Sequence, residues 1–187
     1  MIIYAHGFNS SPASYKSNLL RERLAELMRE DEFACPALSY EPAKAIARLE
    51  LEINSAGPER TTVIGSSLGG FYATWLCEKY GCRSVLVNPA IRPQTGLRAY
   101  LGAQQNLYSG ENYTLTEEHL AHLAAIYLPN LKQHPRYLLL QSTGDEVLDW
   151  REAVSRYAGC RQIIVNGSDH GFSEFRDYLD VVLAFAE

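Results

Sequence analysis

The sequence lacks the features of several classes of protein. Its 17 Lys and Arg residues are outnumbered by 22 Asp and Glu residues, the formal net charge is -5, and no basic cluster occurs. We therefore expect no nucleic acid as a partner. No apolar run approaches the roughly 20 residues that a helix needs to span a bilayer, so no membrane association is expected. The first residues, MIIYAHGF, have neither the basic region nor the cleavage site of a signal peptide. These absences predict a cytoplasmic protein.

Cysteine is also scarce. Four cysteines are scattered along the chain without a CxxC pair, at Cys35, Cys77, Cys82 and Cys160. In a chain without an export signal, such thiols are expected to stay reduced and to act as packing residues. The length of 187 residues suits one domain with a substantial core, so we expect residues 1–187 to form a single domain.

Short apolar runs alternate with helical patterns along the chain. The runs predict strands over residues 2–5, 33–38, 61–64, 84–88, 137–141 and 162–165. Because the runs show little polar alternation, the strands are expected to be buried on both faces of a parallel sheet. Right-handed crossovers then predict an α/β fold with a doubly wound, mainly parallel six-stranded sheet in the order 2-1-3-4-5-6.

Capping and breaking residues predict where the helices lie. Ser11 as N-cap and Pro12 at the first helical position predict a helix that continues to Met28. A second helix over 43–54 is expected to end at Gly57-Pro58, and the last helix is expected to cover 174–185.

One connection, from about residue 90 to about residue 135, is much longer than a crossover requires. Within it, Thr114 and Glu117 have the spacing of a capping box, and an apolar stripe follows them. We expect a helical cap insertion that forms a lid over a site, although one elaborate crossover is the alternative. Apolar and aromatic residues of this segment suit either an acyl pocket or the packing of the cap itself; they include Leu97, Tyr100, Leu101, Leu107, Tyr108, Tyr113 and Tyr127.

The stretch TTVIGSSLGGFYATW, residues 61–75, contains a G-x-S-x-G motif between a predicted strand and a predicted helix. A strand that turns directly into a helix has little room at the bend, so small residues are needed there. Ser67 at the apex is then forced outward. This context predicts a nucleophile elbow, with Ser66 as a packing residue beside it, rather than a simple tight turn.

Reactive side chains follow four of the predicted strands. His6-Gly7-Phe8 follows the first, Ser67 the third, Asp145 the fifth and His170 the last. Because the carboxyl ends of parallel strands meet at one edge of the sheet, we expect these groups to converge. Their chain order, Ser then Asp then His, is that of α/β-hydrolase triads.

Other residues compete for these roles. Asp149 and Asp169 are rivals of Asp145 as the acid. His6 is expected to organise its loop rather than take part in catalysis, and no catalytic role is expected for His119, His122 or His134 in the insertion. A metal site formed by His6, Asp145 and His170 has no support from ligand spacing.

The chain also resembles the α/β-hydrolase superfamily, and more closely the YqiA-like small bacterial esterases. The matching stretches are IIYAHGFNSSPASYK, VIGSSLGGFYA, VLVNPA, STGDEVLD and SDHGF. The resemblance implies a serine hydrolase of acyl esters or thioesters without a cofactor, in which Ser67 is the nucleophile, Asp145 the acid and His170 the base. Two departures matter. The chain starts at the strand before His6-Gly7, without the leading hairpin of larger relatives, and a single glycine precedes Phe8 instead of the HGGG run of many lipases.

In this hypothesis the backbone N–H groups of Leu68 and Phe8 form the oxyanion hole, and the single glycine before Phe8 leaves the identity of the second donor open. The substrate would be a small acyl ester or thioester. Amidase, peptidase or acyltransferase activity uses the same triad. The alternative outside this class is a non-catalytic binding module, in which backbone amides of residues 67–70 hold an anion at a helix N-terminus. Acyl chain length, preference for ester or thioester, and oligomeric state stay open.

Overall fold

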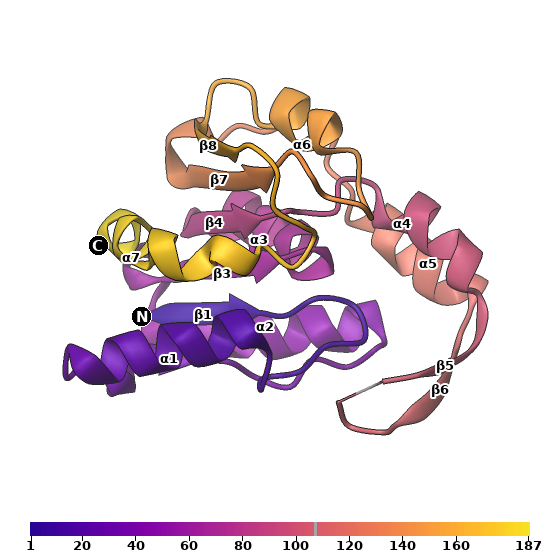
Figure 1. The fold of residues 1–187 in the computed structure, drawn as a ribbon. Coiled ribbons are helices and arrows are strands. Elements are labelled where there is room, and N and C mark those ends of the chain that lie inside the picture. Colours follow the sequence, from indigo (N-terminus) through magenta and orange to yellow (C-terminus); the bar gives the residue numbers. More distant parts are fainter. Residues whose placement is uncertain (107) are drawn as a thin grey trace.

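The computed structural model describes residues 1–106 and 108–187, so Leu107 lies outside the described residues. Six parallel strands form the main sheet in the order β2-β1-β3-β4-β7-β8 (Figure 1). Their bounds are β1 Ile2–Ala5, β2 Phe33–Ala34, β3 Thr62–Ser66, β4 Arg83–Val87, β7 Tyr137–Ser142 and β8 Arg161–Val165. This confirms the predicted doubly wound α/β fold and its strand order.

The central strands are buried on both faces because successive side chains point to opposite sides of the sheet. Ile3 and Val63 pack into one apolar core, whereas Ile2 and Ile64 pack into the other. The predicted strand over 33–38 is wrong in length, because β2 pairs with β1 only at Phe33 and Ala34. Pro36 follows closely, and proline has no N–H to donate to a ladder.

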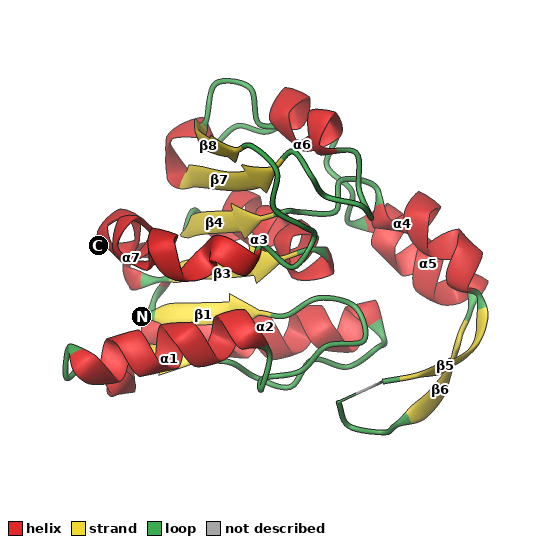
Figure 2. Ribbon diagram, in the orientation of Figure 1, coloured by secondary structure: helices red, strands yellow, loops and turns green. Residues whose placement is uncertain are grey.

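Helices cover both faces of the sheet (Figures 1 and 2). Helices α1 (Tyr15–Glu26) and α7 (Leu179–Ala186) bury their apolar residues on one face. Helices α2 (Pro42–Ala56), α3 (Leu68–Tyr80) and α6 (Trp150–Arg156) supply the core of the other. None of the helices in the described part of the chain combines the length and apolarity needed to cross a membrane.

The first and last helices differ from the prediction, and α1 also ends at Glu26 instead of continuing to Met28. Helix α1 begins at Tyr15 with Ser14 as N-cap, because Ser11 caps a turn instead: its carbonyl accepts from the Ser14 N–H and its Oγ from the Ala13 N–H, both at 3.1 Å. At the other end of the chain, the segment predicted as one helix is a 3₁₀ helix, η5 (Ser173–Tyr178), followed by α7.

The insertion contains more than the predicted helices. After α4 (Pro93–Gly96) and the 3₁₀ helix η3 (Leu97–Tyr100), the chain forms an antiparallel hairpin of β5 (Gly102–Gln105) and β6 (Asn112–Leu115). Helix α5 (Glu117–Ala125) and the 3₁₀ helix η4 (His134–Arg136) complete it. The expectation of a helical cap is therefore only partly right. In Figures 1 and 2 this segment lies beyond the arrowheads of the main sheet, with the hairpin extending from it.

The capping box in the insertion is displaced from the predicted position. Thr116 caps α5, its hydroxyl accepting from the His119 N–H, while Nδ1 of His119 accepts from the Thr116 N–H at 3.2 Å. Thr114 instead belongs to β6. The prediction placed the box too early because it relied on a glutamate at the third helical position, where this helix has a histidine.

The turn from β3 into α3 leaves no room for side chains on its glycines. A Cβ at Gly69 would lie 1.9 Å from the Ala5 carbonyl oxygen, and a Cβ at Gly65 would lie 2.3 Å from the Gly69 carbonyl oxygen. Real atoms cannot approach so closely. Gly69 is therefore required by the contact of this turn with β1, and Gly65 by the tightness of the turn itself.

We predict that Gly69→Ala destabilises the fold by more than about 3 kcal/mol, since the added methyl group meets backbone that cannot rotate away. Gly96→Ala is the matched control, because nothing lies within 4 Å of its added Cβ and its φ of -64° is helical. The control is expected to be neutral or slightly stabilising. Urea unfolding curves measure both variants, and equal stabilities would contradict the proposed role of the close approach.

Candidate active site

Ser67 lies at the sharp bend between β3 and α3. Its backbone has φ 54° and ψ -120°, a conformation that a non-glycine residue adopts only when its surroundings enforce it. The surroundings are a set of backbone hydrogen bonds: the Ser67 N–H donates to Val87 at 3.1 Å, and the Ser67 carbonyl accepts from Gly70 at 2.9 Å and Ala90 at 3.0 Å. The bend thus holds the hydroxyl at the N-terminus of α3.

The structure brings Ser67, His170 and Asp145 together. Nε2 of His170 lies 3.0 Å from Oγ of Ser67, and Nδ1 of the same ring lies 2.9 Å from Oδ2 and 3.0 Å from Oδ1 of Asp145. Oδ1 of Asp145 also accepts from the N–H groups of Val147 at 2.9 Å and Leu148 at 2.8 Å. The Asp145 side chain is fully buried, whereas the His170 side chain is 21% exposed. A hydroxyl, an imidazole and a carboxylate therefore form one chain of hydrogen bonds.

The peptide groups around His170 are held by two side chains that were not predicted from the sequence. Glu146 accepts from the His170 N–H at 2.9 Å. Nδ2 of the fully buried Asn88 donates to the carbonyls of Asp169 at 2.9 Å and His170 at 3.1 Å, and its Oδ1 accepts from Ser142 N–H at 2.8 Å. The available signal for Asn88 was a polar residue at the end of the apolar run SVLVN.

Lys16 supports the same loop from the other side. This residue of α1 is buried, and its Nζ donates to the Gly171 carbonyl at 2.5 Å. Burial lowers the pKa of the Lys16 ammonium to about 8, although Asp169 opposes that shift. The helical pattern alone did not distinguish Lys16 from the other charged residues of its helix.

The loop after β1 packs directly against the bend. A Cβ on Gly7 would lie 3.3 Å from Cβ of Ser67, so a glycine is what allows this approach. The next residue, Phe8, lines the same cavity as Ser67 and Leu68. Among the hydrogen bonds of the described residues, the backbone N–H groups of Phe8 and Leu68 have no acceptor. Two backbone donors are therefore free at this end of the cavity.

His6 has a structural role in this loop. Its Nε2 accepts from the Leu38 N–H at 3.1 Å, which requires the proton on Nδ1, and Nδ1 lies 3.1 Å from the Gly7 carbonyl. Burial lowers the pKa of His6, which favours this neutral form. Both ring nitrogens are thus occupied in joining the loop to the segment after β2, as expected for a loop-organising residue.

The rival carboxylates serve helix termini. Asp149 is the N-cap of α6 and accepts from the Arg151 N–H at 3.0 Å. Asp169 accepts from the N–H and the hydroxyl of Ser173, and these hydrogen bonds lower the pKa of Asp169. Ser66, the alternative serine, is a buried residue of β3. None of the three has the contacts of Ser67 or Asp145 with His170.

The remaining histidines lie in the insertion. His119 belongs to the capping box of α5, His122 lies 4.0 Å from Glu118 on the same helix, and His134 lies in η4. Within residues 1–106 and 108–187, no group of three or more His, Cys, Asp or Glu side chains is arranged to hold a metal ion. All four cysteines are free thiols.

A cavity of about 870 Å³ opens at Ser67 and His170. The insertion contributes apolar surface to its lining through Ile91, Leu97 and Tyr100, and the segment after β7 does so through Val147 and Leu148. Tyr100 and Val147 are large apolar side chains exposed to 49% and 56%, and both border this cavity. The volume and the apolar walls are those of a site for a small organic molecule.

The buried Lys16 predicts a pH dependence of stability. Below about pH 8 the ammonium is charged in both the folded and the unfolded protein, so the cost of burying it is present in full. Between about pH 8 and the ordinary value of 10.5, the unfolded chain binds more protons than the folded one, so stability rises with pH. We expect the wild type to gain on the order of 3 kcal/mol relative to Lys16→Met across this window.

Urea unfolding of the wild type and Lys16→Met at a series of pH values measures this difference. Taking the difference between the two proteins removes the contributions of other groups that titrate in the same range. A difference that stays constant or falls as the pH rises would be inconsistent with a buried ammonium at this position.

Comparisons with known proteins agree with the fold. The model of an uncharacterised protein family, UPF0227, matches residues 1–187. A UPF0227 protein from Pectobacterium carotovorum subsp. carotovorum (strain PC1) is 25% identical over 192 residues, which cover 99% of this chain and 98% of that protein. The solved structure of a putative hydrolase from Agrobacterium vitis S4 matches with a TM-score of 0.79 at 17% identity. The match covers 100% of this chain and 87% of the Agrobacterium chain.

A second solved structure, mouse alpha/beta hydrolase domain-containing protein 10, has a TM-score of 0.73 at 13% identity and covers 100% of this chain and 90% of its own. At these identities the likeness to solved structures shows the fold alone, and it is the α/β-hydrolase fold that the motifs indicated. The family is established by the match along the whole sequence: the chain belongs to UPF0227.

Proposed function

We propose that this protein is a serine hydrolase that cleaves carboxylic esters or thioesters through an acyl-enzyme. The observation that carries the proposal is the chain of hydrogen bonds from Ser67 Oγ through the His170 ring to the buried carboxylate of Asp145. A serine hydroxyl is too weak an acid to react quickly near neutral pH, and this arrangement supplies the base that it needs. The α/β-hydrolase fold, which the chain shares with the Agrobacterium hydrolase, supports the same class.

In the first half of the reaction, Oγ of Ser67 attacks the acyl carbon while Nε2 of His170 takes the hydroxyl proton. Asp145 keeps the other ring proton on Nδ1 and stabilises the imidazolium that forms. The backbone N–H groups of Leu68 and Phe8 donate hydrogen bonds to the substrate oxygen and stabilise its negative charge. When the tetrahedral intermediate collapses, the bond to the alcohol or thiol breaks, and the leaving group takes the proton from His170.

In the second half, water attacks the acyl-enzyme and His170 removes its proton. The same two N–H groups stabilise the negative charge of the second tetrahedral intermediate. Collapse of that intermediate returns the proton to Oγ of Ser67 and releases the carboxylic acid. Every proton in this cycle moves between substrate, water, Ser67 and His170.

The lining of the site favours an apolar acyl group over a charged one. The cavity beside Ser67 is bordered by apolar side chains from both the insertion and the loop after β7, including Leu97, Tyr100 and Val147. An apolar group bound there would remove these side chains from water. The cation Arg92 at the cavity is paired with Glu152 at 2.6 Å, and Asp149 also lines the cavity, so these charged residues provide no net positive charge to attract an anionic substrate.

We predict that Ser67→Ala lowers kcat for a p-nitrophenyl acyl ester by about 10⁴-fold or more, because the nucleophile is lost. The neighbouring Ser66→Ala is the matched control and is expected to retain activity. A fluorophosphonate should label the wild type at Ser67, as located by peptide mapping, and should not label the Ser67→Ala variant. Circular dichroism checks that each variant is folded.

Other outcomes of that experiment would point elsewhere. Turnover retained in folded Ser67→Ala would contradict the assignment of the nucleophile. Absence of both labelling and turnover in the folded wild type would favour a binding module, in which the amides at the start of α3 hold an anion. Labelling without ester hydrolysis, with activity on amides or with transfer to another acceptor, would place the protein elsewhere among acyl-transfer enzymes.

The acyl group is predicted to occupy the cavity beside Ala99. Ala99 borders the cavity and is exposed, so Ala99→Trp should fill part of it without disturbing the core. We expect kcat/KM for an octanoyl ester to fall by about tenfold while that for an acetyl ester changes little, since each methylene excluded from an apolar pocket has a measurable cost. Parallel loss for both esters would show that the acyl chain lies elsewhere.

A further inference from the structure

The hairpin of the insertion contacts the loop that carries Phe8. The Tyr113 hydroxyl of β6 donates to Oδ1 of Asn9 at 2.6 Å, although about a hundred residues separate them along the chain. Nδ2 of Asn106 donates to the Ser10 carbonyl at 3.1 Å, and Nδ2 of Asn9 lies 3.4 Å from Oε1 of Gln104. The residues next to Phe8 on its C-terminal side are therefore bound by side chains of the hairpin.

Tyr113 is itself well fixed. It is buried, and its ring stacks on Tyr40 with centroids 4.2 Å apart and planes 16° from parallel. Burial is the main cause that raises the pKa of Tyr113 to about 12, so the phenol remains a donor throughout the neutral range. A rigid and permanently protonated donor is well suited to holding a loop in place.

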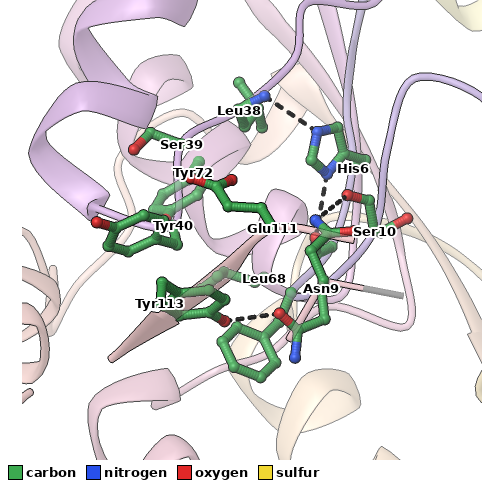
Figure 3. A pocket seen from close by; sticks show the side chains of 13 residues that line it. His6, Asn9, Ser10, Leu38, Ser39, Tyr40, Leu68, Tyr72, Glu111 and Tyr113 are labelled. Carbon is green, nitrogen blue, oxygen red and sulfur yellow. Dashed lines mark hydrogen bonds between the residues drawn. The ribbon is translucent and has the colours of Figure 1, made fainter. Parts of the chain in front are cut away.

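Figure 3 shows how closely the hairpin and the loop approach. Tyr113 and Glu111 of the hairpin segment face His6, Asn9 and the segment after β2 across a small pocket. Its volume is about 30 Å³, which accommodates only about one or two water molecules. Because so little free space separates them, a displacement of the hairpin would be transmitted to the loop.

Asn9 links this contact to the proposed oxyanion hole. Its backbone is left-handed, with φ 51°, and it directly follows Phe8, whose N–H has no acceptor among the described residues. Asn9 borders both the small pocket and the large cavity beside Ser67. The Phe8 N–H belongs to the Gly7–Phe8 peptide group, whose carbonyl lies 3.1 Å from Nδ1 of His6, and on the other side of Phe8 the chain is anchored through Asn9.

We infer that Tyr113 is a positioning residue for the oxyanion hole: through Asn9 it fixes the loop that aims the Phe8 N–H at the substrate oxygen. The insertion then has a task beyond covering the cavity, since its hairpin completes the site. The inference rests on the proposed function, because it concerns the charge that develops during acyl transfer. A donor shifted by a fraction of an ångström stabilises that charge less, while binding of the uncharged ester is hardly affected.

Tyr113→Phe tests this inference because it removes only the hydroxyl and keeps the stacked ring. We expect kcat for a p-nitrophenyl ester to fall about tenfold with KM changed less than about twofold. Affinity for a trifluoromethyl ketone, whose adduct with Ser67 carries the oxyanion, should fall by the same factor as kcat. Tyr40→Phe is the matched control, because it keeps the ring that stacks on Tyr113 and removes only the Tyr40 hydroxyl. That hydroxyl makes no hydrogen bond among the described residues.

A cycle with Asn9→Gly separates the hydrogen bond from general effects on packing. Glycine tolerates the left-handed backbone at this position, so the variant loses mainly the side chain. The double variant should be no slower than Asn9→Gly alone, because both changes break one interaction. If Tyr113→Phe does not fold, Asn9→Gly and Asn106→Ala carry the same expectation for kcat and for the ketone.

Folded Tyr113→Phe with kcat and ketone affinity equal to those of the wild type would overturn the inference. So would equal losses in Tyr113→Phe and Tyr40→Phe, or additive losses in the cycle. Fluorophosphonate labelling of wild-type Ser67, measured first, distinguishes failure of this inference from failure of the proposed function. Without labelling the proposed function fails, whereas labelling with an unaffected Tyr113→Phe variant removes only the role of the hairpin.

Discussion

The bend between β3 and α3 packs so closely against β1 that backbone meets backbone. At Gly69 the nearest obstacle to a side chain is the Ala5 carbonyl, and at Gly65 it is the Gly69 carbonyl. This contact sets the distance between the elbow and the end of β1, and Gly7 continues it by lying against Ser67. Ser67, the proposed nucleophile, and the loop with the proposed oxyanion donor are thereby placed together by the sheet itself. A wider turn would separate them, whatever residues the loops contained.

Backbone strain gathers at the same edge of the sheet. Among the described residues, six non-glycine residues have positive φ. Met28 follows α1, and the other five lie in the loops that follow β1, β3, β4 and β8, at Asn9, Ser67, Asn88, Ser168 and Phe172. Each such residue costs about 1–3 kcal/mol and persists only where its surroundings enforce it. At Asn88 the compensation is visible, since its side chain satisfies buried groups of three other residues. Specific hydrogen bonds hold the loops of the site, and Phe172 adds apolar packing, because its side chain is fully buried in one of the two cores.

Much of this architecture could be predicted because it follows from local patterns and from sheet topology. Strand order and the meeting of Ser67, Asp145 and His170 depend only on which residues end each strand, and a parallel sheet brings those ends to one edge. The choice of Asp145 over Asp169 was harder from sequence, since both follow strands. In the structure Nδ1 of His170 meets Asp145, whereas Asp169 accepts from Ser173. Gly144, where a Cβ would lie 2.3 Å from the Ser168 carbonyl, permits a close approach of two loops. That approach brings the loop after β7 against the loop that carries His170.

The insertion could not be predicted to the same depth, because it has no place in the register of the main sheet. The alternation in NYTL, with Tyr113 and Leu115 buried, is a strand pattern, but four residues do not identify a partner. Whether Tyr113 meets Asn9 or solvent depends on how far the hairpin extends toward β1, and that distance is set by the packing of α4 and α5 on the core. Residues whose partners are fixed by the sheet can be inferred from sequence, whereas those that join an insertion to the sheet require the folded structure.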